Sequence, residues 1–531
     1  MKKIIYIILL ASSVFGLASC TNNFEDINTN PNKINYGQIE SYNCFEPILY
    51  GAGYYQQDFA LYYNNELIQM TAFTGGATSQ IHQYYITSGN WQSIWDNYAR
   101  YGGDCQHMID LAVEEKEKFY ESVGLIMKVY NLANLTSIFG DIPYSEAYQY
   151  SNNLTPKFDT QEEVLTEMLA DLDSASTMLA EGVTPSRSGL DLMYNDSPAK
   201  WRKLANSMRM RLLCRFSGVS DTYWAEIQNM IDNPDKYPVM TSNDDNADVP
   251  FQDVDPYMSY WGQEKMTESS FAPHRLTERV ISMMAQLDDN GNALLVDPRL
   301  PIYGHQRGGK WKGTIAGCST ADYETADDGT AYPNYSIICR ASFPAFLMDY
   351  SEILFIEAEG VVKGKLTIPG ETAKSLYEAA VNASMDKWSA LGATADTPKT
   401  IRSTDVTKFM ASSLGSYDMA AAENGSSIYS SPEELILSQK YISLYWCGFE
   451  QYDEWRRTEY PVLTIGNGTE ANNYELPTRF GYPNYTESSN GVNFSEAITR
   501  MGGTEDDMHL ALDWSYKKLN GGTHRNPYVA Q

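Results

Sequence analysis

The sequence predicts a mostly α-helical fold with one long interruption. Apolar residues recur at the three- and four-residue spacing of helices through residues 120–216 and again through residues 346–455. Between these blocks, from about residue 233 to 345, the pattern gives way to Pro, Gly, Asp and Tyr. Because connections this long usually carry function, we expect a helical scaffold with a loop-rich, ligand-binding insertion.

The first twenty residues have the features of an export signal. Two lysines precede an apolar run over residues 4–10, and small residues stand directly before Cys20. The apolar run is too short to span a bilayer. We therefore expect residues 1–19 to be a lipoprotein signal peptide, with Cys20 acylated and held on a membrane by its fatty acyl chains. An ordinary signal peptide that happens to end in Cys is the alternative.

Residues 20–40 predict an acylated N-terminal tether. The stretch after Cys20 is polar and acidic, a composition typical of flexible segments. Its Glu25-Asp26 pair resembles the short acidic signals that send lipoproteins to the cell surface in the Bacteroidetes. Thr21 differs from the Asp of an inner-membrane retention signal. We expect an outer-membrane location that faces the cell exterior.

Charge and cysteine content exclude several classes of partner. The chain has 68 Asp and Glu against 39 Lys and Arg, a net charge of −29. Such a chain is repelled by nucleic acid and by anionic lipid head groups, so membrane attachment has to come from Cys20. The seven cysteines include no C-x-x-C pair, and we expect most to be buried thiols. Only Cys318 and Cys339, in the loop-rich segment, are candidates for a disulfide.

Three helices are predicted in the first periodic block. Residues 120–139 are apolar nearly all round, which indicates a buried helix that ends at Gly140. Thr160 and Glu163 form a capping box, which opens a second helix. Residues 201–216 form the third. We expect these helices to pack as neighbours, because connections between consecutive elements are usually short.

The second block predicts a further set of helices. One helix is expected inside the insertion, at residues 275–287. Residues 346–362 and 371–388 form a helix-turn-helix pair of roughly tetratricopeptide size, although no strict repeat occurs elsewhere. Another helix is expected at residues 432–455, followed mostly by loop. We therefore expect residues 41–531 to form a single helical domain.

Eight short motifs, taken in order, resemble one family. Together with the lipoprotein signal they are similar to the SusD/RagB family of Bacteroidetes outer-membrane nutrient-binding lipoproteins, over essentially the whole mature chain. The motifs are FEDINTNPN (24–32), FGDIPYSEA (139–147), PKFDTQE (156–162), ANSMRMRL (205–212) after Trp201, DPRL (297–300), SEILF with EAE (351–359), QKYI (439–442) and WRRTEYP (455–461).

The resemblance implies a tetratricopeptide-like fold with ligand-binding loops on one face. It also implies a partner, a SusC-like TonB-dependent outer-membrane transporter over which the lipoprotein sits as a hinged lid. The lid captures an oligosaccharide, or a peptide in some relatives, and no catalysis or cofactor takes part. Most of the motifs are expected to be structural, with Arg456 and Arg457 closing a helix beside Asp453 and Glu454.

Two aromatic stretches are candidate binding regions. Sugar recognition needs flat apolar faces together with amides or carboxylates, and residues 80–101 and the insertion both supply that mixture. The 39 tyrosines suit sugar stacking and helix packing alike. We choose Tyr84, Trp91, Trp261 and Trp311 as ligand-binding residues. Trp91 and Trp95, at i and i+4, fit the core side of a helix equally well, whereas Trp261 and Trp311 are expected to be exposed.

Other chemistries find weaker support. Residues 243–248 and 288–292 have oxygen ligands for calcium, but solvated turns explain them better. Residues 304–310 have Walker spacing, but Trp311 stands where Ser or Thr must hold magnesium. An S-x-x-K match at residues 384–387 lacks its companion motifs. We expect no metal and no catalysis; the alternatives to a glycan-binding lid are a peptide-binding lid and, least favoured, a surface glycoside hydrolase.

Overall fold

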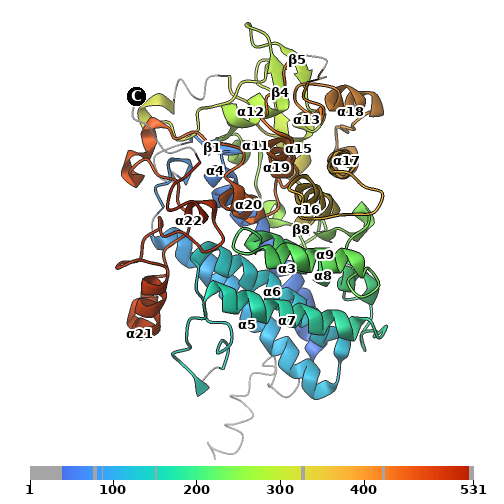
Figure 1. The fold of residues 1–531 in the computed structure, drawn as a ribbon, viewed down its shortest axis with the longest axis vertical. Coiled ribbons are helices and arrows are strands. Elements are labelled where there is room, and N and C mark those ends of the chain that lie inside the picture. Colours follow the sequence, from blue (N-terminus) through green and yellow to red (C-terminus); the bar gives the residue numbers. More distant parts are fainter. Residues whose placement is uncertain are drawn as a thin grey trace, which may run out of the picture.

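The computed structural model describes residues 39–75, 81–86, 88–149, 152–323, 329–420, 422 and 425–525. The expected signal peptide (residues 1–19), Cys20 and most of the expected tether (residues 20–40) lie outside the described residues. Helices dominate the described part, which confirms the predicted fold class (Figure 1). Long helices stack in the lower half of Figure 1, and short strands and helices gather at the top.

The first helical block is a stack of neighbouring helices. α6 packs between α5 and α7, α7 packs on α8, and α8 packs on α9, while α3 lies against α5 and α6. α6 is buried along most of its length, as its all-round apolar sequence predicts. The bounds are α3 (Ser41–Phe59), η2 (Ala60–Asn64), α4 (Asn65–Leu67), η3 (Ile81–Gln83), α5 (Ser88–Glu115), α6 (Lys118–Phe139), α7 (Gln161–Leu179), α8 (Pro198–Phe216), α9 (Asp221–Asp232) and η5 (Asn243–Asp245).

Helix starts in this block follow the expected capping chemistry. The Thr160 side chain accepts from the Glu163 amide at 3.2 Å, and the Glu163 carboxylate accepts from the Thr160 amide at 2.8 Å. The predicted capping box is therefore confirmed as the start of α7. At α8, Ser197 caps the helix and Pro198 occupies its first turn, where a missing N–H costs nothing.

The second helical block joins the first through α16. This helix packs on α17 and α19, and also contacts α8 of the first block. The predicted helix pair is present, but its first member begins at Tyr350 because residues 345–348 form a strand. The bounds are α16 (Tyr350–Val362), α17 (Ala373–Ala393), α18 (Ser403–Met410), α19 (Pro432–Ser443), α20 (Glu450–Thr458), η7 (Asn467–Asn472), α21 (Tyr485–Arg500) and α22 (Tyr516–Leu519).

Two helix predictions in this block were wrong. Residues 432–455 form two helices, because Trp446 and Gly448 adopt positive φ values of 67° and 60° and turn the chain between α19 and α20. The region after residue 455 contains α21, a 16-residue helix that the sequence reading assigned to loop. α21 buries few apolar side chains and bends at Asn490, so its periodic signal is weak.

The insertion at residues 233–345 is built from short elements. Its strands pair antiparallel: β4 with β5 and β6 with β7 inside the insertion, β2 with β8 at its end, and β3 with β1, which belongs to the N-terminal part of the chain. The helix expected at residues 275–287 is only α12, because its ends belong to β3 and β4. The bounds are β1 (Thr71–Phe73), β2 (Ala247–Val249), α10 (Tyr260–Gln263), α11 (Glu268–Phe271), β3 (His274–Leu276), α12 (Glu278–Met284), β4 (Ala285–Leu287), β5 (Ala293–Val296), α13 (Leu300–Tyr303), β6 (Gly304–His305), η6 (Thr320–Asp322), β7 (Tyr332–Pro333), α15 (Tyr335–Ile338) and β8 (Ala345–Met348).

The described cysteines are all free thiols. Cys318 and Cys339 do not bridge each other, and the Cys339 thiol donates to the Met266 carbonyl at 3.4 Å. Burial raises the pKa of Cys318 to about 11 and that of Cys339 to about 12. Since the thiolate is the reactive form, both thiols are held in their inert state.

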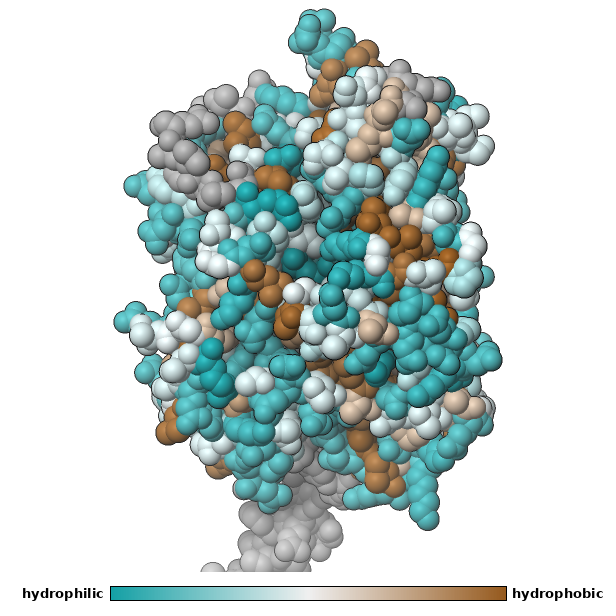
Figure 2. Space-filling model, viewed as in Figure 1, coloured by the Kyte–Doolittle hydropathy of each residue, from teal (hydrophilic) through white to brown (hydrophobic). Residues whose placement is uncertain are grey.

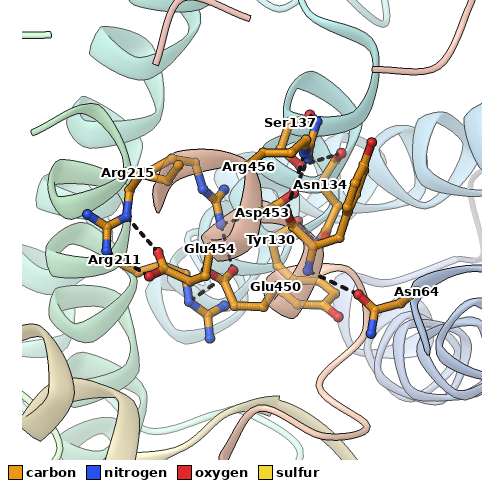
Figure 3. Close-up of polar contacts among 12 residues, drawn as sticks. Asn64, Tyr130, Asn134, Ser137, Arg211, Arg215, Glu450, Asp453, Glu454 and Arg456 are labelled. Carbon is orange, nitrogen blue, oxygen red and sulfur yellow. Dashed lines mark hydrogen bonds and ion pairs between the residues drawn. The ribbon is translucent and has the colours of Figure 1, made fainter. Parts of the chain in front are cut away.

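A buried ionic network lies where α8, α16 and α20 meet (Figure 3). From α8, Arg211 binds both carboxylate oxygens of Glu352 at 2.7 and 2.5 Å, and Arg215 contacts Glu450 at 2.6 Å and Asp453 at 3.0 Å. Arg211 and Glu352 belong to the ANSMRMRL and SEILF motifs, Arg215 follows the first motif on α8, and Glu450 and Asp453 lie on α20. They hold three helices together, so their role is structural, as expected.

A second ionic network joins α16, α19 and α20. Arg457 contacts Glu359 at 2.7 and 2.6 Å and Glu454 at 3.1 and 2.8 Å, and Lys440 reaches Glu454 at 2.8 Å. Burial acts to raise the pKa of Glu359 and Glu454, but nearby cations, Arg457 first among them, hold both pKa values below the usual range. The carboxylates are thus kept charged inside the protein.

Asp248, on β2, is a buried carboxyl whose ionisation should weaken the fold. Lys387 contacts both oxygens of the neighbouring Asp349 at 2.6 Å. Burial raises the pKa of Asp248 to about 7, with Lys387 opposing the rise and Asp349 adding to it. Between about pH 4 and 7 the folded protein therefore holds a proton that the unfolded chain releases. The free energy of unfolding falls as pH rises through this window.

We expect Asp248→Asn to be more stable than the wild type at pH 8, by on the order of 1 kcal/mol, and by a smaller margin at pH 5, where only part of the loss has occurred. Urea denaturation at the two pH values measures the difference. Asp253→Asn, an exposed carboxyl in the following loop, is the control. An equal effect of Asp248→Asn at both pH values would contradict the assignment.

Candidate functional site

Two of the four predicted ligand-binding residues lie in the core. Tyr84 is 0% exposed, and its hydroxyl accepts from the Gln69 amide at 2.8 Å. Trp261 is 1% exposed and packs edge-to-face against Phe271 and Trp446, with ring centroids 5.3 Å away in both cases. The expectation that Trp261 is exposed was wrong, because aromatic rings distant in sequence enclose it. Neither side chain presents a face to solvent.

The two tryptophans of α5 differ in their surroundings. Trp95 packs against Phe139, Phe158 and Tyr482, which confirms the core alternative for this residue. Trp91 is half-buried in the first turns of α5, with Gly481 beside its ring. The role of Trp91 in ligand binding stays a prediction.

Trp311 lines a cavity in the insertion. Its side chain is only 5% exposed, so the expected exposure was wrong. Its indole nevertheless forms part of the wall of a cavity of about 640 Å³, which we call the Trp311 cavity. The wall comes from α12 and the β4–β5 hairpin (Glu278, Ile281, Ser282, Ala285, Gln286, Leu287, Asn290 and Gly291), from residues Lys310, Trp311, Lys312 and Gly313, and from Ser413, Leu414, Ser426 and Ile428.

Backbone pairing fixes the position of Trp311. The Thr314 amide donates to the Leu276 carbonyl and the Glu278 amide donates to the Thr314 carbonyl, both at 2.8 Å. Gly313 lies between Trp311 and this pairing, and a Cβ placed there would approach the Thr277 and Glu278 backbone to 2.3–2.5 Å. Only glycine permits this approach. The segment is therefore held against the start of α12 with the indole on the cavity wall.

The lining combines the groups that carbohydrate recognition requires. Ile281, Leu287, Leu414 and Ile428 supply apolar surface beside the indole, and side-chain amides and hydroxyls come from Gln286, Asn290, Ser282 and Ser413. The volume lies within the usual range of small-molecule sites. The cavity can therefore cover the apolar face of a sugar and hydrogen-bond its hydroxyl groups.

Four of the tyrosines pack together where α3 and η2 meet α10. The Tyr54 ring lies 5.9 Å from Tyr50 and 5.0 Å from Tyr260, and Tyr260 lies 6.3 Å from Tyr62. The Tyr54 hydroxyl donates to Glu264 at 2.8 Å. These rings and hydroxyls already have partners within the protein, which favours the helix-packing interpretation for this group.

The acidic segments considered for calcium act within the protein. Asp288 accepts from the amides of Asn290 and Asn292 at 2.9 and 2.8 Å and so closes the β4–β5 turn. Asp245 contacts Lys203 at 2.7 Å. Among the described residues, no group of three or more His, Cys, Asp or Glu side chains is arranged to hold a metal ion. Both segments fit the structural alternative.

Sequence reasoning missed most of the Trp311 cavity. α12 contributes Ile281 and Ser282, and the loop before α19 contributes Ser413 and Ile428, none of which carries an aromatic signal. Only the clustering of Trp311 with polar residues pointed to this region. The opposing wall lies about a hundred residues further along the chain, and no local pattern could connect the two.

The part of the chain described by the structure includes no helix both long and apolar enough to cross a bilayer. Figure 2 shows hydrophilic residues over most of the viewed face, with hydrophobic residues gathered in small patches between them.

Comparisons with known proteins show which family and which solved structures this chain is similar to. A family model of SusD-like proteins, described as starch-binding and associating with the outer membrane, matches residues 31–483. No curated protein sequence matches the chain. Among solved structures, a chitin-binding protein is 25% identical with a TM-score of 0.72, covering 89% of this chain and 99% of its own.

Two further structures show the same fold at lower identity. A chitin-binding SusD homolog from Flavobacterium johnsoniae is 22% identical with a TM-score of 0.70, covering 89% of this chain and 98% of its own. A SusD homolog from Parabacteroides distasonis is 21% identical with a TM-score of 0.74, covering 90% and 98%. With the family model spanning most of the sequence, the chain belongs to the SusD-like family of outer-membrane-associated proteins.

Proposed function

We propose that this protein is a surface lipoprotein that binds an oligosaccharide in the Trp311 cavity and delivers it to a SusC-like TonB-dependent transporter. The family is glycan-binding and outer-membrane associated. The observation that carries the proposal is the cavity itself, about 640 Å³ with an indole wall, apolar side chains and side-chain amides and hydroxyls. This combination suits a polyhydroxylated ligand better than a purely apolar one.

Trp311→Ala should weaken oligosaccharide binding by about 1.5 to 3 kcal/mol, because the indole contributes the largest flat apolar surface of the cavity. This corresponds to a roughly ten- to hundredfold higher Kd. Isothermal calorimetry of residues 21–531 against plant, host and microbial oligosaccharides provides the measurement. Tyr485→Ala is the control, since this exposed aromatic begins α21, at the other end of Figure 1. Unchanged affinity in Trp311→Ala would remove the cavity from consideration.

Cys20 is the proposed acylation site and the only membrane attachment. Cys20→Ala should give a folded protein in the soluble fraction, because the acyl chains are then never added. Fractionation with mass spectrometry of the mature N-terminus measures both properties. A Cys20→Ala protein that remained in the membrane fraction would show that another segment anchors the chain.

The proposal includes binding without turnover. A purified lid should leave its ligand intact, whereas a glycoside hydrolase would release new reducing ends from the same polymer. Chromatography of the ligand after incubation distinguishes the two. Binding of peptides but not glycans by the same variants would favour the peptide-binding lid, and co-purification with a large outer-membrane barrel would support the transporter partner.

A further inference from the structure

The Trp311 cavity has a positive rim in a strongly acidic protein. Lys310 and Lys312 flank the indole and are both exposed, and Glu278 is the acidic residue among the lining side chains. The Lys310 ammonium donates to the Asn290 carbonyl at 2.7 Å, a contact that positions the side chain but leaves its charge in place. The cavity therefore offers cationic donors beside its apolar and amide groups.

A second cavity on the other side of the β4–β5 hairpin repeats this charge pattern. Its volume is about 610 Å³, and β5 forms one wall through Leu294, Leu295 and Val296. Its charged lining residues are Lys399, Arg402, Asp405 and Lys408.

Arg402 is paired with Asp405 at 2.7 Å, so Lys399 and Lys408 supply the excess positive charge in this second cavity. Burial lowers the pKa of Lys399. An anion close to Lys399 would offset that cost.

The two cavities invert the charge balance of the whole chain. Their linings carry five Lys or Arg residues and two acidic residues, whereas the chain carries 39 Lys and Arg against 68 Asp and Glu. A cleft lined by one sign of charge concentrates its field even when the net charge of the protein has the opposite sign. A ligand with negative groups would be repelled by the net negative charge of the protein but attracted to these two linings.

We infer that the Trp311 cavity is selective for anionic oligosaccharides, which carry carboxylate or sulfate groups. The inference rests on the proposed function and names the ligand class of the same site. The indole and apolar side chains cover the sugar ring, while Lys310 and Lys312 contact the acidic substituents through charge-assisted hydrogen bonds. The second cavity, lined by β5 of the same hairpin, offers further cationic groups to a longer chain.

The test compares size-matched oligosaccharides of three kinds, a neutral chito- or malto-oligosaccharide, an oligouronate and a sulfated oligosaccharide. Calorimetry with residues 21–531 at low and at raised salt should show at least tenfold tighter binding of one anionic probe at low salt, with affinity falling as salt rises. The uronate and sulfate probes separate the two sources of negative charge.

Variants of Lys310 and Lys312 test whether these lysines cause the preference for anionic probes. Lys310→Gln with Lys312→Gln should lose at least tenfold in affinity for the anionic probe and most of its salt dependence, while Lys310→Arg with Lys312→Arg retains both. Lys118→Gln, an exposed lysine at the start of α6, is the control. Thermal melts confirm that each variant is folded.

Two results would overturn the inference. The first is equal or tighter binding of the neutral probe, and the second is wild-type affinity of the Gln double variant for the anionic probe. If the neutral probe binds and this binding is lost in Trp311→Ala, the proposed function stands and only the inferred selectivity for anionic ligands is wrong. Failure of all three probes to bind would remove both.

Discussion

Arg457→Ala is expected to destabilise the protein by about 3 to 5 kcal/mol. Arg457 is buried, and its guanidinium contacts both oxygens of Glu359 and both oxygens of Glu454. Its removal leaves two buried carboxylates with only Lys440 and Lys363 nearby. An uncompensated buried charge cannot recover the water that it lost on folding. Equilibrium denaturation in urea measures the change in the free energy of unfolding.

The matched control is Arg402→Ala. Arg402 pairs with Asp405 through two contacts of 2.7 and 3.0 Å at the start of α18, with the same three-residue spacing as Glu454 and Arg457 near the end of α20. The Arg402 side chain is 76% exposed, so its pair should contribute less than about 1 kcal/mol. Similar losses in the two variants would mean that burial does not determine the strength of the Arg457 network.

Trp261→Ala is expected to cost about 3 to 5 kcal/mol in stability and to leave oligosaccharide affinity unchanged. The indole is enclosed by Phe271, Trp446 and Tyr260, so truncation opens a cavity that these rings cannot fill. Denaturation measures the stability, and calorimetry at a temperature where the variant is folded measures the affinity. Lost stability with unchanged affinity is the result expected of a core residue, whereas lost affinity in the folded variant is the result expected of a binding residue.

Tyr257→Ala provides the comparison for Trp261. Tyr257 lies four residues earlier in the same segment and is 39% exposed, so its truncation should change stability by less than about 1 kcal/mol. A folded Trp261→Ala protein that had lost its ligand would restore the sequence-based role of Trp261.

The helical scaffold was largely predictable from the sequence because its signals are local. α6 is apolar on every face, and the α7 capping box lies within four residues. The break between α19 and α20 was not predictable, since Trp446 continues the apolar pattern while adopting a left-handed conformation. A periodic apolar pattern indicates which side chains are buried. A turn that keeps its side chains buried does not interrupt this pattern, so the pattern cannot reveal the turn.

The candidate site was predictable only in part. Trp311 and Trp261 both looked exposed among polar neighbours and both are buried, but only Trp311 lines a cavity, and its role in ligand binding stays a prediction. The difference lies in Phe271 and Trp446, and the latter is nearly two hundred residues away in sequence. The opposing wall, with Ser413 and Ile428, likewise arises from tertiary packing.

The close backbone approach at Gly313 fixes the backbone of this segment but not the identity of the exposed side chains beside it. Gly313 and the pairing of Thr314 with Leu276 and Glu278 hold the backbone of this segment in one position. The side chains of Lys310 and Lys312, which precede the glycine, are exposed and can change without altering the backbone path. Under the proposed function, exchange of these exposed side chains changes which ligand is bound while the backbone stays the same.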